Sequence, residues 1–321
     1  MQSRFVVLGT GGTIAGTAAA ADDHLGYQAA QLGIQTLLAG VPALKDWPVE
    51  AEQLAQLDSK DATHALWQAL AQRASHHLAR PEVAGVIVTH GTDTMEEAAY
   101  FLHRVLAPRD KPVVFTGAMR PATALMADGP QNLVDALTLA ATPGARGVLV
   151  TMGGGVHGAA EVRKQHSYRL DTLSCGDAGA LGFVEAGRLR RLRDWPAGEA
   201  LGLAAVSAPV AHWPRVDVVM SHGGADGRVV RALLAAGTDG LAVAATGNGT
   251  LHAALLAALE EAAARGVPVL VASRCAHGGV IAQPGQRFET AGTLTPVAAR
   301  IELLLQLLAR RAAAAGPDGA A

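Results

Sequence analysis

The chain has 321 residues, half of them apolar and 17% charged, and its formal net charge at pH 7 is −2. This length allows one large or two medium domains, and the composition is typical of a globular protein rather than a disordered one. We find no basic stripe typical of nucleic-acid binding, no basic amphipathic segment and no run of roughly 20 apolar residues, so we expect neither a nucleic-acid nor a membrane partner.

The first half of the chain alternates short apolar runs with helical patterns. Each run is continuous and rich in β-branched residues, as a strand buried on both faces must be. Strands that alternate with helices indicate a parallel sheet, so we predict an α/β fold with helices on both faces of the sheet. The expected elements are strands over Phe5–Leu8, Val83–Thr89, Pro112–Phe115 and Gly147–Met152, with a helix over Met95–Leu106.

The composition of the sequence changes after residue 187, where clustered arginines are followed by two Trp-Pro pairs. We therefore predict an N-terminal catalytic domain over 1–187, a linker over 188–214 and a smaller α/β domain over 215–311. The tail, 312–321, lacks core-forming residues and is expected to be disordered. The elements expected in the second domain are strands over Val216–Met220, Gly240–Ala245 and Val267–Ala272, and helices over Leu251–Arg265 and Pro296–Arg311.

Two features bear on location in the cell. Cys175 and Cys275 lie far apart and lack the CxxC spacing of metal sites, which favours two free thiols in a reducing compartment. The first apolar run, Phe5–Leu8, is too short for the apolar region of a signal peptide. We therefore expect a cytoplasmic protein.

The first polar loop follows the first expected strand and spans Gly9–Gly16. Its glycines suggest a dinucleotide-binding loop, but that fingerprint requires a sixth-position glycine where this chain has Ile14. What distinguishes the loop is its two hydroxyl groups, on Thr10 and Thr13. Because ligands bind outside the carboxyl ends of parallel strands, these hydroxyls are candidates for a site.

The second polar loop, Thr89–Glu97, follows the next expected strand. One interpretation is structural: a threonine or aspartate caps the following helix, and a glutamate completes a capping box. A functional role is compatible with this, because free N–H donors at a helix N-terminus can hold an anion or a developing oxyanion. The candidate caps are Thr92, Asp93 and Thr94, and the candidate box partners are Glu96 and Glu97.

Two further elements, Ser59 and Lys164, are ambiguous by themselves. Ser59 lies in a polar knot that could simply cap a helix, and Lys164 could be a solvated surface residue. Together with Thr13, Thr92 and Asp93, however, they supply the types of group that attack on a carbonyl of an amino-acid substrate needs. A threonine hydroxyl needs a base, the substrate ammonium needs an anion, and the substrate carboxylate needs donors.

At this point the sequence resembles the bacterial-type L-asparaginase family, from about residue 5 to about residue 310. Two of its motifs, Thr10–Gly16 and His90–Glu97, are highly specific when they occur together. The motifs that carry the resemblance are Thr10–Gly16, Asp58–Ser59, His90–Glu97, Gly117–Pro121, Ala127–Pro130, Lys164 and Gly247–Gly249.

The resemblance implies catalytic roles. Thr13 matches the primary nucleophile, and Tyr27, which follows a lid-like loop, matches the tyrosine that assists it. Thr92, Asp93 and Lys164 match a second catalytic group in which the lysine acts on the threonine. The implied reaction is hydrolysis of L-asparagine to L-aspartate and ammonia, with neither a cofactor nor a metal.

The resemblance also implies how substrate is held. Ser59 matches a residue that binds the substrate carboxylate, Asp93 holds the ammonium, and Thr92 contacts the substrate. Asn248 matches a residue that reaches the active site of a neighbouring subunit. A homodimer or homotetramer with shared active sites is therefore implied.

Some features depart from the family. Many relatives carry glutamine where this chain has Lys60, and the segment 279–287 looks shortened, with only Gln283 and Glu289 near the position of a glutamate found in some relatives. These departures lie around the substrate's α-groups, so a glutaminase-asparaginase or an amidase of broader specificity is an open alternative. A non-catalytic amino-acid-binding module is a second one.

Overall fold

The computed structural model describes residues 3–107 and 110–315. The chain divides between Leu203 and Ala204 into two compact units. None of the helices in the described part of the chain has the length and apolarity that a transmembrane span requires.

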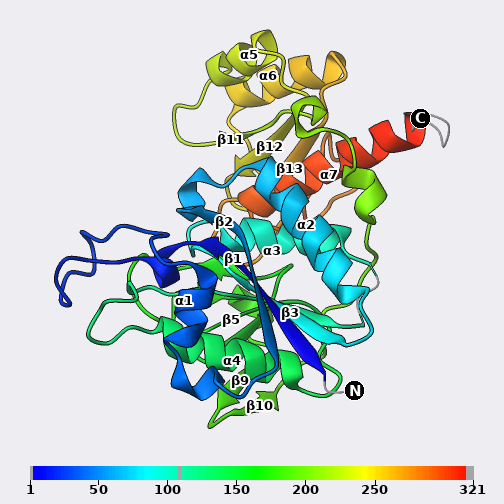
Figure 1. The fold of residues 1–321 in the computed structure, drawn as a ribbon. Coiled ribbons are helices and arrows are strands. Elements are labelled where there is room, and N and C mark those ends of the chain that lie inside the picture. The colour runs from blue at the N-terminus through cyan, green and yellow to red at the C-terminus, as the bar shows by residue number, and fades with distance from the viewer. Residues whose placement is uncertain (1–2, 108–109, 316–321) are drawn as a thin grey trace. The chain divides into compact units, whose positions relative to one another are not determined.

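The first unit is built on an eight-stranded sheet in the order β10-β9-β6-β5-β4-β3-β1-β2. Strands β2, β1, β3, β4 and β5 run parallel, and β6, β9 and β10 extend the sheet by antiparallel pairing (Figure 1). A separate two-stranded ribbon pairs β7 with β8. The strands are β1 (Arg4–Gly11), β2 (Val49–Leu57), β3 (Val83–Thr89), β4 (Pro112–Thr116), β5 (Gly147–Met152), β6 (Gly155–Gly158), β7 (Arg163–Lys164), β8 (Leu173–Ser174), β9 (Gly182–Glu185) and β10 (Arg188–Arg191).

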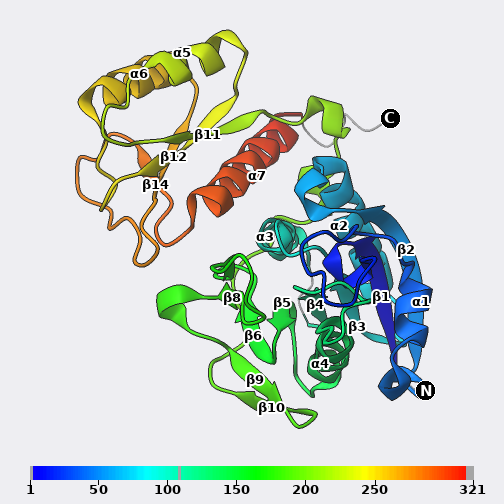
Figure 2. The same cartoon turned by 90° about the vertical axis from the view of Figure 1, so that its left-hand side faces the viewer.

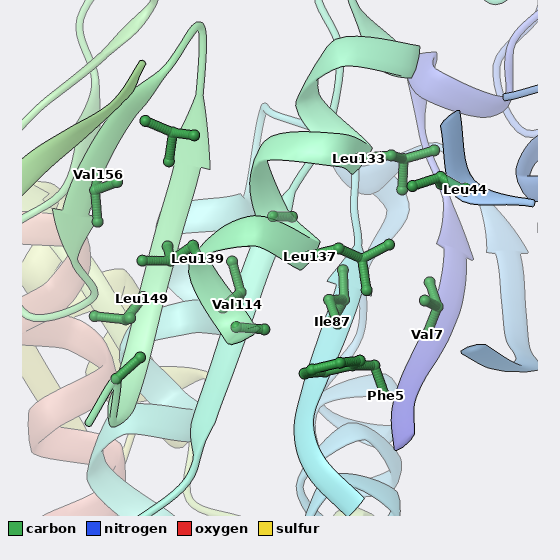
Figure 3. Close-up of a cluster of buried hydrophobic side chains, with 14 of the residues drawn as sticks. Phe5, Val7, Leu44, Ile87, Val114, Leu133, Leu137, Leu139, Leu149 and Val156 are labelled. Carbon is green, nitrogen blue, oxygen red and sulfur yellow. The ribbon is translucent and has the colours of Figure 1, made fainter. Parts of the chain in front are cut away.

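Helices cover both faces of this sheet, as predicted. Figure 2 shows α2 (His64–Leu78) and α3 (Met95–Val105) on one face and α4 (Gly129–Ala141) on the opposite face, with α1 (Ile34–Ala39) beside β1 and β2. Successive strand residues point to opposite faces, so every second residue of β1 belongs to the cluster under α4. That cluster joins sheet residues to the apolar side of the helix (Figure 3), and its members include Phe5, Val7, Ile87, Val114, Leu133, Leu137 and Leu149.

The order of strands positions the functional loops. From β1 the chain passes to β2 on one side and then returns to β3 on the other side of β1. Such a reversal leaves a crevice between the loops that follow the two diverging strands. Here those loops begin after Gly11 of β1 and Thr89 of β3, so the topology favours a binding crevice between the two threonine loops.

The second unit has a four-stranded parallel sheet in the order β11-β12-β13-β14. Its core joins the sheet to α5 and α6, and Leu303 of α7 lies close to Gly240 of β12. The elements are β11 (Val216–Met220), β12 (Gly240–Ala245), β13 (Val269–Ser273), β14 (Glu289–Thr290), α5 (Arg228–Ala235), α6 (Ala253–Ala264) and α7 (Pro296–Ala315).

Several boundaries differ from the sequence predictions. Arg188–Arg191, expected at the start of a linker, form β10 and pair with β9. Charged side chains commonly protect the edge of a sheet, so the sequence of an edge strand can be as polar as that of a linker. In β10, Arg190 pairs with Glu185. At the other end, α7 continues to Ala315, so 312–315 of the expected tail is helical because alanine favours helix. Residues 316–321 lie outside the described part.

Candidate active site

The first loop turns sharply after β1. Gly11 and Gly12 have φ angles of 103° and 81°, which other residues rarely adopt, and they lead into a short 3-10 helix over Thr13–Ala15. Thr10 is buried, and its hydroxyl donates to the carbonyl of Thr89 at 2.8 Å. Of the two hydroxyls singled out from the sequence, that of Thr10 therefore joins β1 to β3, and only Thr13 is partly exposed.

The Thr13 hydroxyl lies 2.6 Å from the phenolic oxygen of Tyr27. Between these two residues the chain makes a loop that is closed by paired main-chain hydrogen bonds of 2.9 Å between Thr17 and Gln28. The main chain of Ala18 also donates to the hydroxyl of Thr123 at 2.8 Å. The loop thus returns Tyr27 to the nucleophile candidate and is attached to the segment after β4.

The second loop follows β3. His90 is fully buried, and burial lowers its pKa, so the ring is neutral at pH 7. Its Nδ1 lies 2.8 Å from the carbonyl oxygen of Gly91, and a neutral ring can make that contact only as the donor. Thr92 is buried, whereas Asp93 exposes 56% of its side chain.

The helix start differs from the predicted capping box. Thr94 is the N-cap residue of α3, but its side chain makes no capping hydrogen bond. Instead, the Thr94 hydroxyl donates to the main-chain carbonyl of Ser59 at 2.8 Å. The carboxylate of Glu96 is likewise used elsewhere, because it accepts a hydrogen bond from the main-chain N–H of Lys164. Both side chains therefore bind main-chain groups from distant parts of the sequence instead of capping their own helix.

The loops after β1 and β3 are in direct contact with each other and with Ser59. A Cβ atom on Gly12 would lie 2.5 Å from the Cα of Gly91, and a Cβ on Gly91 would lie 2.4 Å from Ser59 Oγ. These distances are far below van der Waals contact, so only glycine fits at either position. The packing places Thr13 and Thr92, each one residue beyond these glycines, at adjoining points of the crevice.

Lys164 joins this group from the β7–β8 ribbon. Its ammonium donates to Thr92 Oγ1 at 2.8 Å and to Asp93 Oδ1 at 2.6 Å, and its side chain is 19% exposed. The surface-lysine interpretation that its local sequence favoured is therefore wrong. Thr92 Oγ1 also donates to Met119 Sδ at 3.5 Å, so this hydroxyl donates one hydrogen bond and accepts one.

Ser59 and Lys60 lie in a short helix over Ser59–Asp61. Asp58 is its N-cap and accepts from the main-chain N–H of Lys60. The Lys60 ammonium is bound by two carboxylates, at 2.8 Å from Asp58 and 3.2 Å from Asp61. Ser59 is buried against Gly91. The departure at Lys60 is thus locally neutralised.

Asn248 lies in the second unit, in the turn after β12. Its side chain accepts from the main-chain N–H of Ile281 at 2.7 Å and donates to the carbonyl of the same residue at 3.3 Å. Asn248 is exposed, and Gly247 and Gly249 on either side have positive φ angles. The first unit therefore brings together all the predicted site residues except Asn248.

Sequence reasoning overlooked the role of Asp128. Its carboxylate accepts from the main-chain N–H groups of Met119 and Arg120, both at 2.9 Å, and from the Asn132 side chain at 3.2 Å. This network shapes the loop that carries Met119 to Thr92. The available signal was an aspartate directly before Gly-Pro at a helix start, which is also typical of an ordinary cap.

Comparison with known proteins agrees with this arrangement. Residues 4–196 match the family description "Asparaginase, N-terminal", and residues 215–315 match "Glutaminase/Asparaginase C-terminal domain". The chain belongs to the asparaginase family. The family resemblance proposed from the motifs is confirmed, and so is the α/β architecture that it implied.

Individual members of the asparaginase family resemble the chain over nearly its whole length. "Probable L-asparaginase periplasmic" of Haemophilus influenzae is 36% identical, over 94% of this chain and 87% of that protein. "Glutaminase-asparaginase" of Pseudomonas fluorescens biotype A is 34% identical, over 94% and 85%. The crystal structure of the probable cytoplasmic L-asparaginase from Campylobacter jejuni superimposes with a TM-score of 0.90 at 34% identity, covering 97% of this chain and 98% of that one.

Proposed function

We propose that this asparaginase-family member hydrolyses the side-chain amide of L-asparagine, giving L-aspartate and ammonia. The family match and the names of relatives that share a third of its residues support the reaction. The observation that carries the mechanism is the pair of threonine hydroxyls at neighbouring strand ends. One of them contacts a phenol at 2.6 Å and the other an ammonium at 2.8 Å.

In the proposed first step, Thr13 Oγ1 attacks the side-chain carbonyl carbon of asparagine. The Tyr27 oxygen takes up the Thr13 proton while the phenol gives its own proton to the leaving nitrogen, so the C–N bond breaks and ammonia departs. The product is an ester between Thr13 and the aspartyl group. In the second step, water attacks this ester and the C–O bond to Thr13 breaks. One proton of the water passes through the Thr92 hydroxyl, which Lys164 holds in place, to Thr13 Oγ1, and aspartate leaves.

The same geometry suggests how the α-groups of the substrate are held. Asp93 is the most exposed member of the group and presents its free carboxylate oxygen, which suits an α-ammonium. Ser59 and Thr92 supply hydroxyl groups beside Gly91, and we place the α-carboxylate there. Asparagine would then bind with its side-chain carbonyl toward Thr13.

An ammonia-release assay on L-asparagine with the purified protein and a Thr13→Ala variant tests the function. We expect turnover by the wild type, no turnover by the variant, and retained asparagine binding to the variant by calorimetry. Retained turnover in the variant would remove Thr13 from its role. Binding without turnover in the wild type would favour the alternative of an amino-acid-binding module.

A broader glutaminase-asparaginase is the second candidate, because two relatives from Pseudomonas species carry that name. Glutamine is one methylene longer than asparagine, which a pocket distinguishes only modestly, by roughly 10- to 200-fold. Relative kcat/KM values for asparagine and glutamine measured on one preparation decide between the two.

We further propose that the active site is shared between subunits of a homodimer, or of a homotetramer built from two such dimers. The exposed Asn248 turn, fixed by Ile281 and by two glycines with positive φ angles, is a suitable rigid element to present to a neighbouring subunit. Sedimentation of the purified protein, together with the complementation test in the Discussion, examines this proposal.

For location we propose the cytoplasm. The structural neighbour from Campylobacter jejuni is described as cytoplasmic, whereas the Haemophilus influenzae relative is named as periplasmic. Both cysteines of this chain are free thiols in the structure. Fractionation of the source cells, followed by immunodetection of the chain, separates the two compartments.

A further inference from the structure

The carboxylate of Glu96 is used in an unusual way for a residue in the first turn of a helix. It accepts a hydrogen bond from the main-chain N–H of Lys164, 68 residues along the chain. The same short segment that carries Glu96 also carries Thr92 and Asp93, which bind the ammonium of that lysine. One segment therefore holds Lys164 at both ends, by its main chain and by its side chain.

The main chain of Lys164 needs such a partner. In the β7–β8 ribbon the neighbouring Gln165 donates its N–H across to the carbonyl of Thr172 at 2.8 Å. Hydrogen-bonded and non-bonded pairs alternate along an antiparallel ladder, so the N–H of Lys164, opposite Leu173, points away from β8. A partly buried N–H without a partner costs free energy, and Glu96 supplies that partner.

The ribbon itself has little means of fixing Lys164. Strands β7 and β8 are two residues each, and an isolated two-stranded ribbon is marginally stable. The lysine side chain is long and flexible, so the position of its nitrogen depends on where its main chain is held. A carboxylate acceptor makes a stronger hydrogen bond than a neutral one, which suits it for this purpose.

Resting on the function proposed above, we propose that Glu96 is a positioning residue that fixes the main chain of Lys164 and so maintains the contact of its ammonium with Thr92 and Asp93. Glu96 touches none of the reacting atoms. Retaining it is costly to the fold, because burial raises the pKa of its carboxyl group to about 7 and thus opposes ionisation. A carboxyl group at this unfavourable position is expected where it has a functional role, here the positioning of Lys164.

Two substitutions separate charge from reach. Glu96→Gln keeps the length of the side chain and removes the charge, whereas Glu96→Asp keeps the charge and shortens the reach. We expect both variants to lower kcat by about 10- to 100-fold, since a small misplacement of a catalytic group has such effects, with KM changing less than about twofold. Glu185→Gln, at an exposed glutamate on the sheet edge that pairs with Arg190, is the control and should keep the wild-type kcat.

A spectroscopic measurement tests the contact without using activity. The sequence contains four lysines, so selective ¹⁵N-lysine labelling gives four amide signals per chain, and Lys164→Arg identifies the one of interest. We expect the Lys164 amide of the wild type to shift between pH 6 and 8 as Glu96 ionises, with an apparent pKa of about 7. In Glu96→Gln that titration should be absent.

Wild-type kcat in both Glu96 variants, or an unchanged Lys164 titration in Glu96→Gln, would overturn the proposal. These results would leave the asparaginase function standing, because ammonia release would continue. Conversely, a wild-type protein that releases no ammonia but shows the Lys164 titration would refute the proposed function while keeping the Glu96–Lys164 contact.

Discussion

Gly12 and Gly91 are packed so tightly that a Cβ atom added to Gly12 would lie 2.5 Å from the Cα and 2.5 Å from the main-chain nitrogen of Gly91. They are 79 positions apart, yet each is followed at once by a threonine of the site, Thr13 or Thr92. The shared crevice therefore depends on two residues that carry no chemistry of their own.

The first prediction concerns Gly91→Ala. The new methyl group would lie 2.4 Å from Ser59 Oγ and 2.7 Å from its Cβ, so the loops must separate. We expect kcat/KM for asparagine to fall by about 100-fold or more, because loop displacements of this size disrupt catalytic geometry. Steady-state ammonia release measures the effect. The control is Gly223→Ala, where nothing lies within 4 Å of the added atom and activity should be unchanged.

The second prediction concerns Tyr27→Phe, which removes one oxygen atom and leaves the ring. The 2.6 Å contact with the Thr13 hydroxyl is lost, and proton transfer from the nucleophile loses its acceptor. We expect kcat to fall by about 100-fold or more, the usual contribution of a positioned acid or base. Stopped-flow or steady-state assays with asparagine provide the measurement. A wild-type rate would show that another group accepts the Thr13 proton.

The third prediction concerns Lys164→Met, which keeps most of the side-chain volume and removes the charge. Contacts of 2.8 Å with Thr92 and 2.6 Å with Asp93 disappear. We expect turnover to fall by about 100- to 10,000-fold, with a smaller change in asparagine affinity. Kinetics and calorimetry on one preparation separate the two effects. Lys45→Met, at an exposed position, serves as the control and should behave like the wild type.

The fourth prediction concerns the pH dependence of stability. Burial raises the pKa of Glu96 from 4.5 to about 7. The folded state therefore holds this proton more tightly, and the resulting stabilisation is fully present below pH 4.5 and lost as pH rises through 7. Because Glu96→Gln cannot ionise, the melting temperature of this variant relative to the wild type should be higher at pH 8 than at pH 5. Thermal denaturation at both pH values measures the difference. An equal difference at both would contradict the raised pKa.

The fifth prediction tests shared active sites by complementation. Thr13→Ala and Asn248→Ala should each be inactive or strongly impaired as homo-oligomers. If Asn248 serves the neighbouring subunit, a mixed dimer contains one site in which both residues are intact. Random 1:1 mixing then restores about a quarter of wild-type activity. Activity of the mixture equal to the mean of the two separate variants would mean that each site is complete within one chain.

The sequence by itself determined the strands that are buried on both faces. Val83–Thr89 and Gly147–Met152 fall at their predicted bounds, because an uninterrupted β-branched run can satisfy its packing in few other ways. The motif residues were also identified from the sequence, since Gly-rich loops at strand ends are local features. The edge strand Val49–Leu57 escaped prediction, because half-buried residues with many polar side chains give a weak strand pattern.

Only the tertiary structure decided which polar residues do chemistry. Thr10 and Thr13 look equivalent in the sequence, but one is buried against Thr89 and the other contacts Tyr27. The sequence around Lys164 is compatible with a surface residue, but in the structure the β7–β8 ribbon places its ammonium beside Thr92. Hydrogen-bond partners separated by many residues are set by packing rather than by local preference, so no pattern in the nearby sequence could reveal them.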